Sequence, residues 1–217
     1  MSAGNITIPV FVVHHNKLTE RKAYMLNQLG KYFINPVWVE TFPPETLTID
    51  PVEKRINKNE YSLFLKFKSA LEQGVENNYS YFIVFEDDVV LTDEFVNDFP
   101  LILNTFISNK GDLLMLGDCC NIGVPGALKD EIMHWEPNYT TRCGHAILYT
   151  KECAEKIIPK LVSPLKGYDH KLNDVVTDLG LKSYYLLKGL EQTTQSNNPI
   201  LRQRFLSSVQ PHVTVAY

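Results

Sequence analysis

The sequence predicts an α/β fold in which helices flank a mostly parallel central sheet. Short apolar runs alternate with segments whose apolar residues recur at helical spacing, and this alternation is typical of parallel α/β proteins. The run 81–85 is continuously apolar, as expected of a central strand that is covered on both faces. Because 217 residues can bury one sizeable core, we expect a single domain over residues 1–217.

The expected elements follow one another along the chain. The predicted strands cover residues 9–14, 36–40, 81–85, 112–117, 146–149 and 181–187. The predicted helices cover residues 19–32, 59 to about 75, a segment after residue 92, 151–158 and 168–179. Thr19, Thr92 and Thr150 are the expected N-caps, and Gly180 is the expected residue after the last helix. Residues 118–141 show no period, so we expect a long loop, a feature that is usually functional or mobile in a compact domain.

Composition and charge exclude several classes of protein. The formal charge is −4 and no block of like charges appears, so a nucleic-acid binder is not expected. The apolar runs are much shorter than the roughly 18 residues that a membrane helix needs, and residues 1–7 show no secretory signal. The 4 cysteines have no metal-finger or redox spacing. We therefore expect free thiols and a soluble, cytoplasmic protein without a transmembrane segment.

Three acidic residues, Glu86, Asp87 and Asp88, follow the apolar run directly. Two like charges about 4 Å apart repel by roughly 1 kcal/mol in water and about 4 kcal/mol at an effective dielectric constant of 20. A divalent cation removes this repulsion, and carboxylate oxygens suit Mg²⁺ or Mn²⁺. If the strand pleat continues, Glu86 and Asp88 face one side and are the expected metal ligands. The alternative is an acidic turn that caps the next helix.

The run 81–91, which contains Glu-Asp-Asp-Val, resembles the core motif of glycosyltransferase family 25. This family includes lipopolysaccharide sugar transferases and collagen hydroxylysine galactosyltransferases. Further segments are similar to family motifs in the same order, namely residues 12–21, 141–146, 169–173 and 184–192. The chain departs from the family at His14-His15, at Leu65-Lys66 and at Lys188-Gly189. These departures concern the identity of the sugar donor more than the fold.

The resemblance implies a glycosyltransferase-A type nucleotide-binding fold and an inverting, metal-dependent sugar transfer. The sugar, galactose or glucose by family analogy, would move from a nucleotide-sugar such as a UDP-sugar to a hydroxyl of a glycan, lipid-linked or protein acceptor. Glu86 and Asp88 would hold Mn²⁺ or Mg²⁺ against the diphosphate, and Asp87 would orient ribose or sugar hydroxyls. The alternative is a non-catalytic family member that binds a sugar nucleotide or a partner transferase.

An inverting transfer needs a base beside the acceptor hydroxyl. Asp169 is the candidate, because it stands in the Asp-x-x-Leu-Asn segment at the start of a predicted helix. The alternative is that Asp169 only caps that helix. Asp174 is the second candidate for the base, and His212 is a candidate third metal ligand.

Five further residues are candidates for contacts with the donor. His14 would contact the nucleotide base, and Arg21 would contact the diphosphate. Arg142 and His145 would contact phosphate or sugar, and Asp118 would contact donor or acceptor. Ordinary structural roles compete with these: loop polarity for His14, a solvated helix position for Arg21, an Asx-turn for Asp118 and a hydrogen-bonded buried ring for His145.

Overall fold

One mixed β-sheet forms the frame of the molecule, in the strand order β2-β1-β3-β7-β5-β8-β4 with β6 paired to β8. The computed structural model describes residues 6, 8–49, 56–117, 126–128, 131–136, 144–162 and 166–192. Within these residues the strands are β1 (Val10–Val13), β2 (Val37–Val39), β3 (Tyr81–Glu86), β4 (Val89–Val90), β5 (Leu113–Gly117), β6 (Met133–His134), β7 (Ala146–Thr150) and β8 (Ser183–Gln192).

The strands run mostly in one direction. β1 pairs in parallel with β2 and β3, and β5 pairs in parallel with β8. β7 lies between β3 and β5 and is antiparallel to both, so β3 and β5 themselves share one direction. The short strands β4 and β6 are antiparallel to β8. The predicted α/β fold with a mostly parallel sheet is confirmed, and the reversed β7 at its centre is the feature that the sequence pattern does not indicate.

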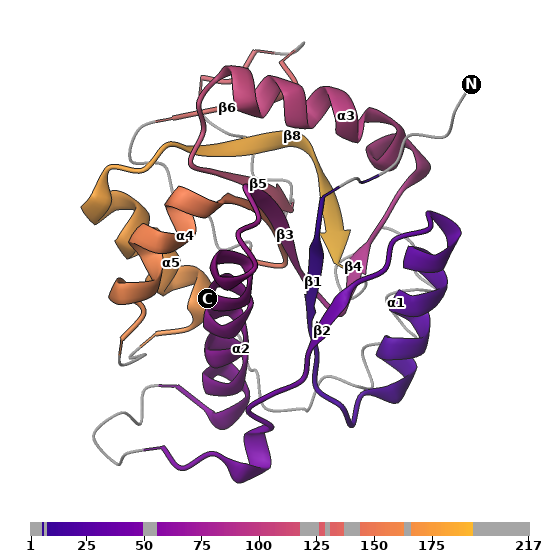
Figure 1. Cartoon of the computed structure of the whole chain (residues 1–217), viewed down its shortest axis with the longest axis vertical. Helices are drawn as coiled ribbons and strands as arrows, with labels where there is room; N and C mark the ends of the chain where they lie inside the picture. Colours follow the sequence, from indigo (N-terminus) through magenta and orange to yellow (C-terminus); the bar gives the residue numbers. More distant parts are fainter. Residues whose placement is uncertain are drawn as a thin grey trace.

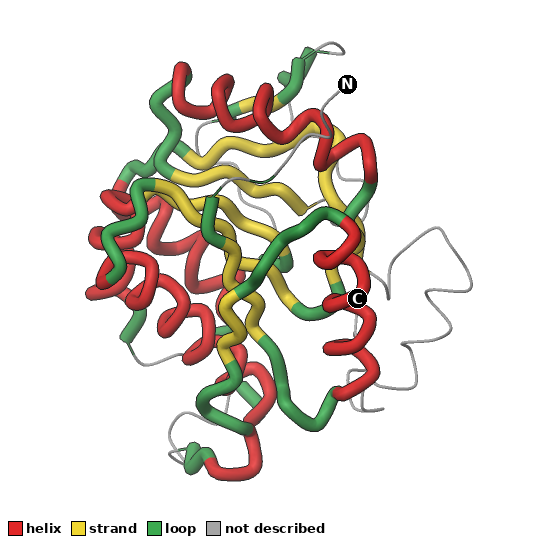
Figure 2. Tube along the Cα trace, turned by 45° about the vertical axis from the view of Figure 1, so that its right-hand side comes forward, coloured by secondary structure: helices red, strands yellow, loops and turns green. Residues whose placement is uncertain are grey.

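Helices cover both faces of the sheet (Figures 1 and 2). They are α1 (Thr19–Lys31), α2 (Lys58–Glu76), α3 (Asp93–Ser108), α4 (Lys151–Ile157) and α5 (Tyr168–Leu179), with short 3-10 turns η1 (Pro44–Thr46) and η3 (Ile158–Lys160). Alternate residues of β3 serve the two faces: Phe82 and Val84 join the core beneath α2, α4 and α5, whereas Ile83 and Phe85 join the core beneath α1 and α3. This division explains the continuously apolar sequence of the strand.

Three of the four residues predicted to mark helix ends do so, namely Thr92, Thr150 and Gly180. The hydroxyl of Thr92 accepts a hydrogen bond from the N–H of Phe95, and that of Thr150 accepts one from Cys153. Gly180 follows α5 with φ of 59°, a left-handed conformation that glycine adopts without strain. The prediction that Thr19 is an N-cap is wrong. Thr19 is the first residue of α1, and the N-cap is Leu18, whose side chain cannot accept a hydrogen bond.

Two strands were not expected. β6 lies within residues 118–141, where a loop is predicted, and β4 follows the acidic residues. Each has two residues, too few to show the alternation by which a strand is recognised. β8 extends to Gln192, beyond the predicted end at residue 187.

Cys153 is buried and has a free thiol, in agreement with the expectation for this residue. The other three cysteines, Cys119, Cys120 and Cys143, lie outside the described residues. Among the helices that the structure describes, none combines the length and the apolar character required to cross a membrane.

Candidate functional site

Polar residues follow β1 and β3 at the point where these neighbouring parallel strands end. The register aligns Val13 with Glu86, so His14 comes beside Asp87. β3 ends at Glu86, and the next two residues, Asp87 and Asp88, form a turn before β4, here called the acidic turn. The strand pleat therefore does not continue through Asp88, and the expected division of the acids between two faces of a strand does not apply.

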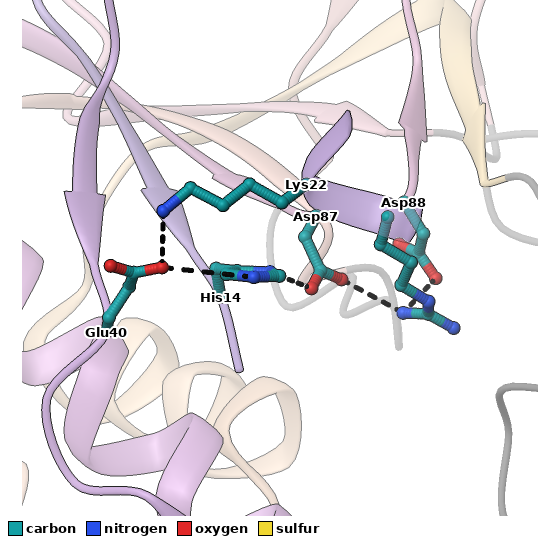
Figure 3. A network of polar contacts seen from close by, with 6 residues as sticks. His14, Lys22, Glu40, Asp87 and Asp88 are labelled. Atoms are coloured by element: carbon teal, nitrogen blue, oxygen red, sulfur yellow. Dashed lines mark hydrogen bonds and ion pairs between the residues drawn. The ribbon is translucent and has the colours of Figure 1, made fainter. Parts of the chain in front are cut away.

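Asp87 is held by two partners from different elements (Figure 3). Nδ1 of His14 lies 2.6 Å from Oδ2 of Asp87, and Nη1 of Arg21 in α1 donates to Oδ1 at 2.9 Å. The same Nη1 lies 3.4 Å from Oδ2 of Asp88. Both carboxylates are buried, with exposed fractions of 6% for Asp87 and 5% for Asp88. Arg21 is thus not a solvated helix residue, and it joins α1 to the acidic turn.

His14 is enclosed on its other side. Its ring packs edge-on against Trp38 with 5.4 Å between the ring centroids, and its Nε2 lies 3.9 Å from Oε1 of Glu40. Lys22 donates to the same Glu40 oxygen at 2.7 Å, as Figure 3 shows. With 1% of its surface exposed, His14 acts first as a link between β1 and the acidic turn. Its contact with a nucleotide base stays a prediction.

Glu86 and Asp87 have different electrostatic environments. Burial raises the pKa of Glu86 well above its ordinary value, and the carboxylates of Asp88, Asp87 and Asp169 raise it further. Burial also opposes ionisation of Asp87, but the hydrogen bond with His14 and the charge of Arg21 outweigh it and lower the pKa of Asp87. Asp87 is therefore a stabilised anion, whereas Glu86 carries the repulsion of the cluster.

A basic cavity of about 420 Å³ opens between β1, η1 and α2. Its charged lining comprises Lys17, Arg21, Lys66, Glu86 and Asp87, together with the two histidines that follow β1. The lining thus has three cations and two imidazoles but only two carboxylates, and one of these, Asp87, is already paired with Arg21. This balance of charge favours an anionic ligand.

An acidic cavity of about 250 Å³ lies on the other side of Glu86, between α2 and the start of α5. Its lining includes three carboxylates and two histidines, namely Glu60, Glu86, Asp169, His145 and His170. Glu86 lines both cavities, so this carboxylate stands at their junction.

The reversed direction of β7 creates this junction. The N–H of Glu86 donates to the carbonyl of His145 at 2.8 Å, which brings the start of β7 to the end of β3. Gly144 directly precedes His145, and a Cβ at this position would lie 3.6 Å from Cβ of Asp169 and 3.9 Å from Oε1 of Glu86. The missing side chain at Gly144 leaves open the space between these two carboxylates.

Asp169 lies in the first turn of α5, but it is not the N-cap. That position belongs to Gly167, which has no side chain, and Oδ1 of Asp169 accepts from the N–H of His170 at 2.8 Å. Tyr168 fixes the start of α5, because its ring stacks on Phe67 at 4.1 Å and its hydroxyl bonds that of Tyr149 at 2.8 Å. The second candidate base, Asp174, pairs at the surface with Lys166 at 2.8 Å.

His145 has a structural role in the sheet. Its Nε2 lies 2.8 Å from the carbonyl oxygen of Leu190 in β8, and its ring is 1% exposed. A Cβ at Gly117 would come within 2.3 Å of this ring, so glycine is required at the end of β5. A contact of His145 with phosphate or sugar stays a prediction. Asp118, Arg142 and His212 lie outside the described residues.

The carboxylates fit a metal site that a ligand would complete. Among the residues that the structure describes, no group of three or more His, Cys, Asp or Glu is arranged to hold a metal ion. Mg²⁺, however, commonly takes only one or two carboxylates and completes its shell with substrate phosphates and water. Burial raises the pKa of Glu86 and the charge of Asp88 raises it further, and a divalent cation would relieve this repulsion.

Lys66 is one of several residues lining the two cavities that the sequence does not predict as site residues, like Lys17, Glu60, Gly144 and His170. It interrupts the run Leu-Phe-Leu-Lys-Phe at 63–67 in the middle of α2, and it is 3% exposed. A charged residue inside an apolar helical run is the signal that could have identified it, because such a residue is seldom buried without a purpose.

No protein-family model matches the chain, and no curated protein matches it. A solved structure does: a glycosyltransferase involved in the glycosylation of the major capsid of PBCV-1. Its TM-score is 0.52 at 9% sequence identity, over 92% of this chain and 98% of that one. A mutant UDP-glucose pyrophosphorylase from Leishmania major in complex with UDP-glucose reaches a TM-score of only 0.25 at 12% identity, over 92% and 41%, which is too low to carry an argument. At 9% identity the first likeness shows the fold, that of a glycosyltransferase.

Proposed function

We propose that this protein is an inverting, metal-dependent glycosyltransferase that moves a hexose from a UDP-sugar to an acceptor hydroxyl. The observation that carries the proposal is the position of Glu86 at the junction of a basic and an acidic cavity. The fold shared with a glycosyltransferase supports sugar transfer in general. Membership of family 25 rests on the sequence motifs.

The basic cavity suits the diphosphate of the donor. Departure of a nucleoside diphosphate leaves additional negative charge on its oxygens, and nearby fixed cations stabilise that charge. Arg21 and Lys17 line this cavity, and the ion pair with Asp87 holds the Arg21 guanidinium in place. Glu86 and Asp88 would hold Mn²⁺ or Mg²⁺, which supplies Lewis-acid stabilisation of the leaving group. Asp87 and His14 would contact the ribose and the base where they face the cavity.

The acidic cavity suits the acceptor. Asp169 would accept the proton of the attacking hydroxyl, since a carboxylate placed beside that group is the base such a transfer needs. Donor and acceptor would then approach the junction from opposite sides of Glu86, as inversion at the sugar carbon requires. The stacking of Tyr168 on Phe67 fixes the helix start that carries Asp169.

The experiment is a panel of nucleotide-sugars, with UDP-glucose and UDP-galactose first, assayed for binding and for donor hydrolysis with Mn²⁺ or with EDTA. We expect micromolar to millimolar binding of a UDP-sugar that depends on Mn²⁺, with slow hydrolysis. Binding without hydrolysis or transfer would favour the non-catalytic alternative. Failure of every nucleotide-sugar to bind would contradict the proposal.

A further inference from the structure

Lys66 is a buried cation without a partner. Its side chain leaves the middle of α2 and lines the basic cavity, with an exposed fraction of 3%. Within the described part of the chain, its ammonium makes no hydrogen bond or ion pair. Most of the Lys66 side chain is buried, but its Nζ stays accessible in the cavity, where an anionic ligand would reach it.

The carboxylates that act on Lys66 from a distance already have cations of their own. They are Asp87, Glu45 and Glu40. Asp87 is paired with Arg21 at 2.9 Å.

The other two carboxylates are paired with lysines. Glu45 is paired with Lys17 at 2.5 Å, and Glu40 is paired with Lys22 at 2.7 Å. Each carboxylate that acts on Lys66 is thus already paired with another cation. An anionic ligand in the basic cavity would supply the ion-pair partner that Lys66 lacks among the described residues.

His15 adds a second polar group, and its Nε2 lies 3.9 Å from Oε2 of Glu45. It lines the same cavity, and its Nδ1 is buried and makes no hydrogen bond. Burial and the charge of Lys66 lower the pKa of His15, so its ring is neutral at neutral pH and offers one N–H to an acceptor. The Lys66 ammonium and the ring of His15 line one cavity, and an ammonium beside a neutral imidazole that turns its N–H toward the ligand binds phosphate oxygens.

We propose that Lys66 and His15 form a subsite for one phosphate of the donor diphosphate, which binds without the metal. The identity of the ligand as a nucleoside diphosphate rests on the proposed function, whereas its anionic character rests on the cavity itself. Of the two carboxylates that would hold the metal, Glu86 lines the same cavity, so the metal and the subsite would contact one ligand.

The test measures the affinity of inorganic pyrophosphate in EDTA by calorimetry. Lys66→Met should weaken binding by about 10- to 100-fold, the size expected for one hydrogen bond to a charged group. The matched control is Lys68→Met, because Lys68 is a half-buried lysine of the same helix that lines neither cavity. His15→Asn, which keeps a small polar side chain, should weaken pyrophosphate binding less than Lys66→Met does, and it provides a second test if Lys66→Met does not fold.

The thermal stability of the ligand-free variants separates a binding role from a structural one. Lys66→Met should unfold at the same temperature as the wild type or higher, because the substitution breaks no hydrogen bond or ion pair of the described residues and keeps an apolar chain against the core. A large loss of stability together with unchanged pyrophosphate affinity would show a structural lysine and overturn the proposal. Equal affinities of the wild type, Lys66→Met and His15→Asn would also overturn it.

Binding of UDP with Mn²⁺ distinguishes the subsite from the proposed function. If UDP binds all variants equally and pyrophosphate binds none, the subsite is wrong while the glycosyltransferase proposal stands. If pyrophosphate binding depends on Lys66 but no nucleotide-sugar binds, the subsite is correct and the glycosyltransferase proposal fails.

Discussion

Replacement of Arg21 by glutamine tests the buried network behind the acidic turn. The guanidinium pairs with Asp87 at 2.9 Å and with Asp88 at 3.4 Å, and both carboxylates are almost completely buried. Removal of one partner from a buried ion pair costs about 3–5 kcal/mol, and the amide of glutamine recovers about 1 kcal/mol as a hydrogen-bond donor. We therefore expect a loss of about 2–4 kcal/mol, which in a domain of this size lowers Tm by about 4–16 °C.

Thermal and urea unfolding of Arg21→Gln at pH 7 measures this loss. The control is Lys22→Gln in the same helix, which breaks the part-exposed pair with Glu40 and should cost less than about 1 kcal/mol. The pKa of Asp87 is lowered in the folded state, so its ionised form stabilises the fold above the unfolded pKa of about 3.9. This contribution is lost as the pH falls through the folded pKa, so the wild type and Arg21→Gln should converge in acid. Equal, small losses of unfolding free energy in Arg21→Gln and Lys22→Gln would show that the pairs of Arg21 with Asp87 and Asp88 do not stabilise the fold.

Three further substitutions test the junction of the cavities. Glu86→Gln should raise the Tm of the metal-free protein at pH 7 by about 2–4 °C per kcal/mol of repulsion relieved. Because the folded pKa of Glu86 is raised, this gain should vanish as the pH falls below the unfolded value of about 4.3, and a pH series of melting curves shows it. Asp169→Asn should keep UDP affinity and stability but lower the rate of sugar transfer by about 10²–10⁴-fold. Asp174→Asn should leave the transfer rate unchanged. Loss of transfer in Asp174→Asn alone would identify Asp174 as the base. Gly144→Ala should be tolerated, because its Cβ meets neighbours at 3.6–3.9 Å, but Gly144→Val should fill the acidic cavity and abolish transfer while UDP still binds in calorimetry. Full transfer by Gly144→Val would place the acceptor elsewhere.

The parts of the fold that could be predicted are those with local signals. The apolar run of β3, the caps at Thr92 and Thr150 and the glycine after α5 each depend on a few neighbouring residues. The prediction of Thr19 as an N-cap is wrong because threonine also occurs as the first residue of a helix. In α1 the preceding Leu18 occupies the cap position. Local chemistry therefore locates elements better than it locates their first residue.

The arrangement of the site depends on contacts between distant residues. The pattern of β7 identifies a strand but has no direction, so the approach of Gly144 to Glu86 could not be foreseen. Likewise, Arg21 resembles any surface arginine in the sequence, and only the fold brings it to Asp87 across 66 residues. The acidic residues were recognised because three adjacent carboxylates are costly in themselves, whatever lies around them.

A crystal structure of the protein with UDP and Mn²⁺, with diffraction recorded at the manganese absorption edge, would locate the metal and the nucleotide. We expect an anomalous peak beside Glu86 and Asp88, with the diphosphate in the basic cavity near Lys66 and the acidic cavity at Asp169 left open for the acceptor. Nucleotide density at another surface, or an anomalous peak away from Glu86 while UDP is bound, would contradict this expectation.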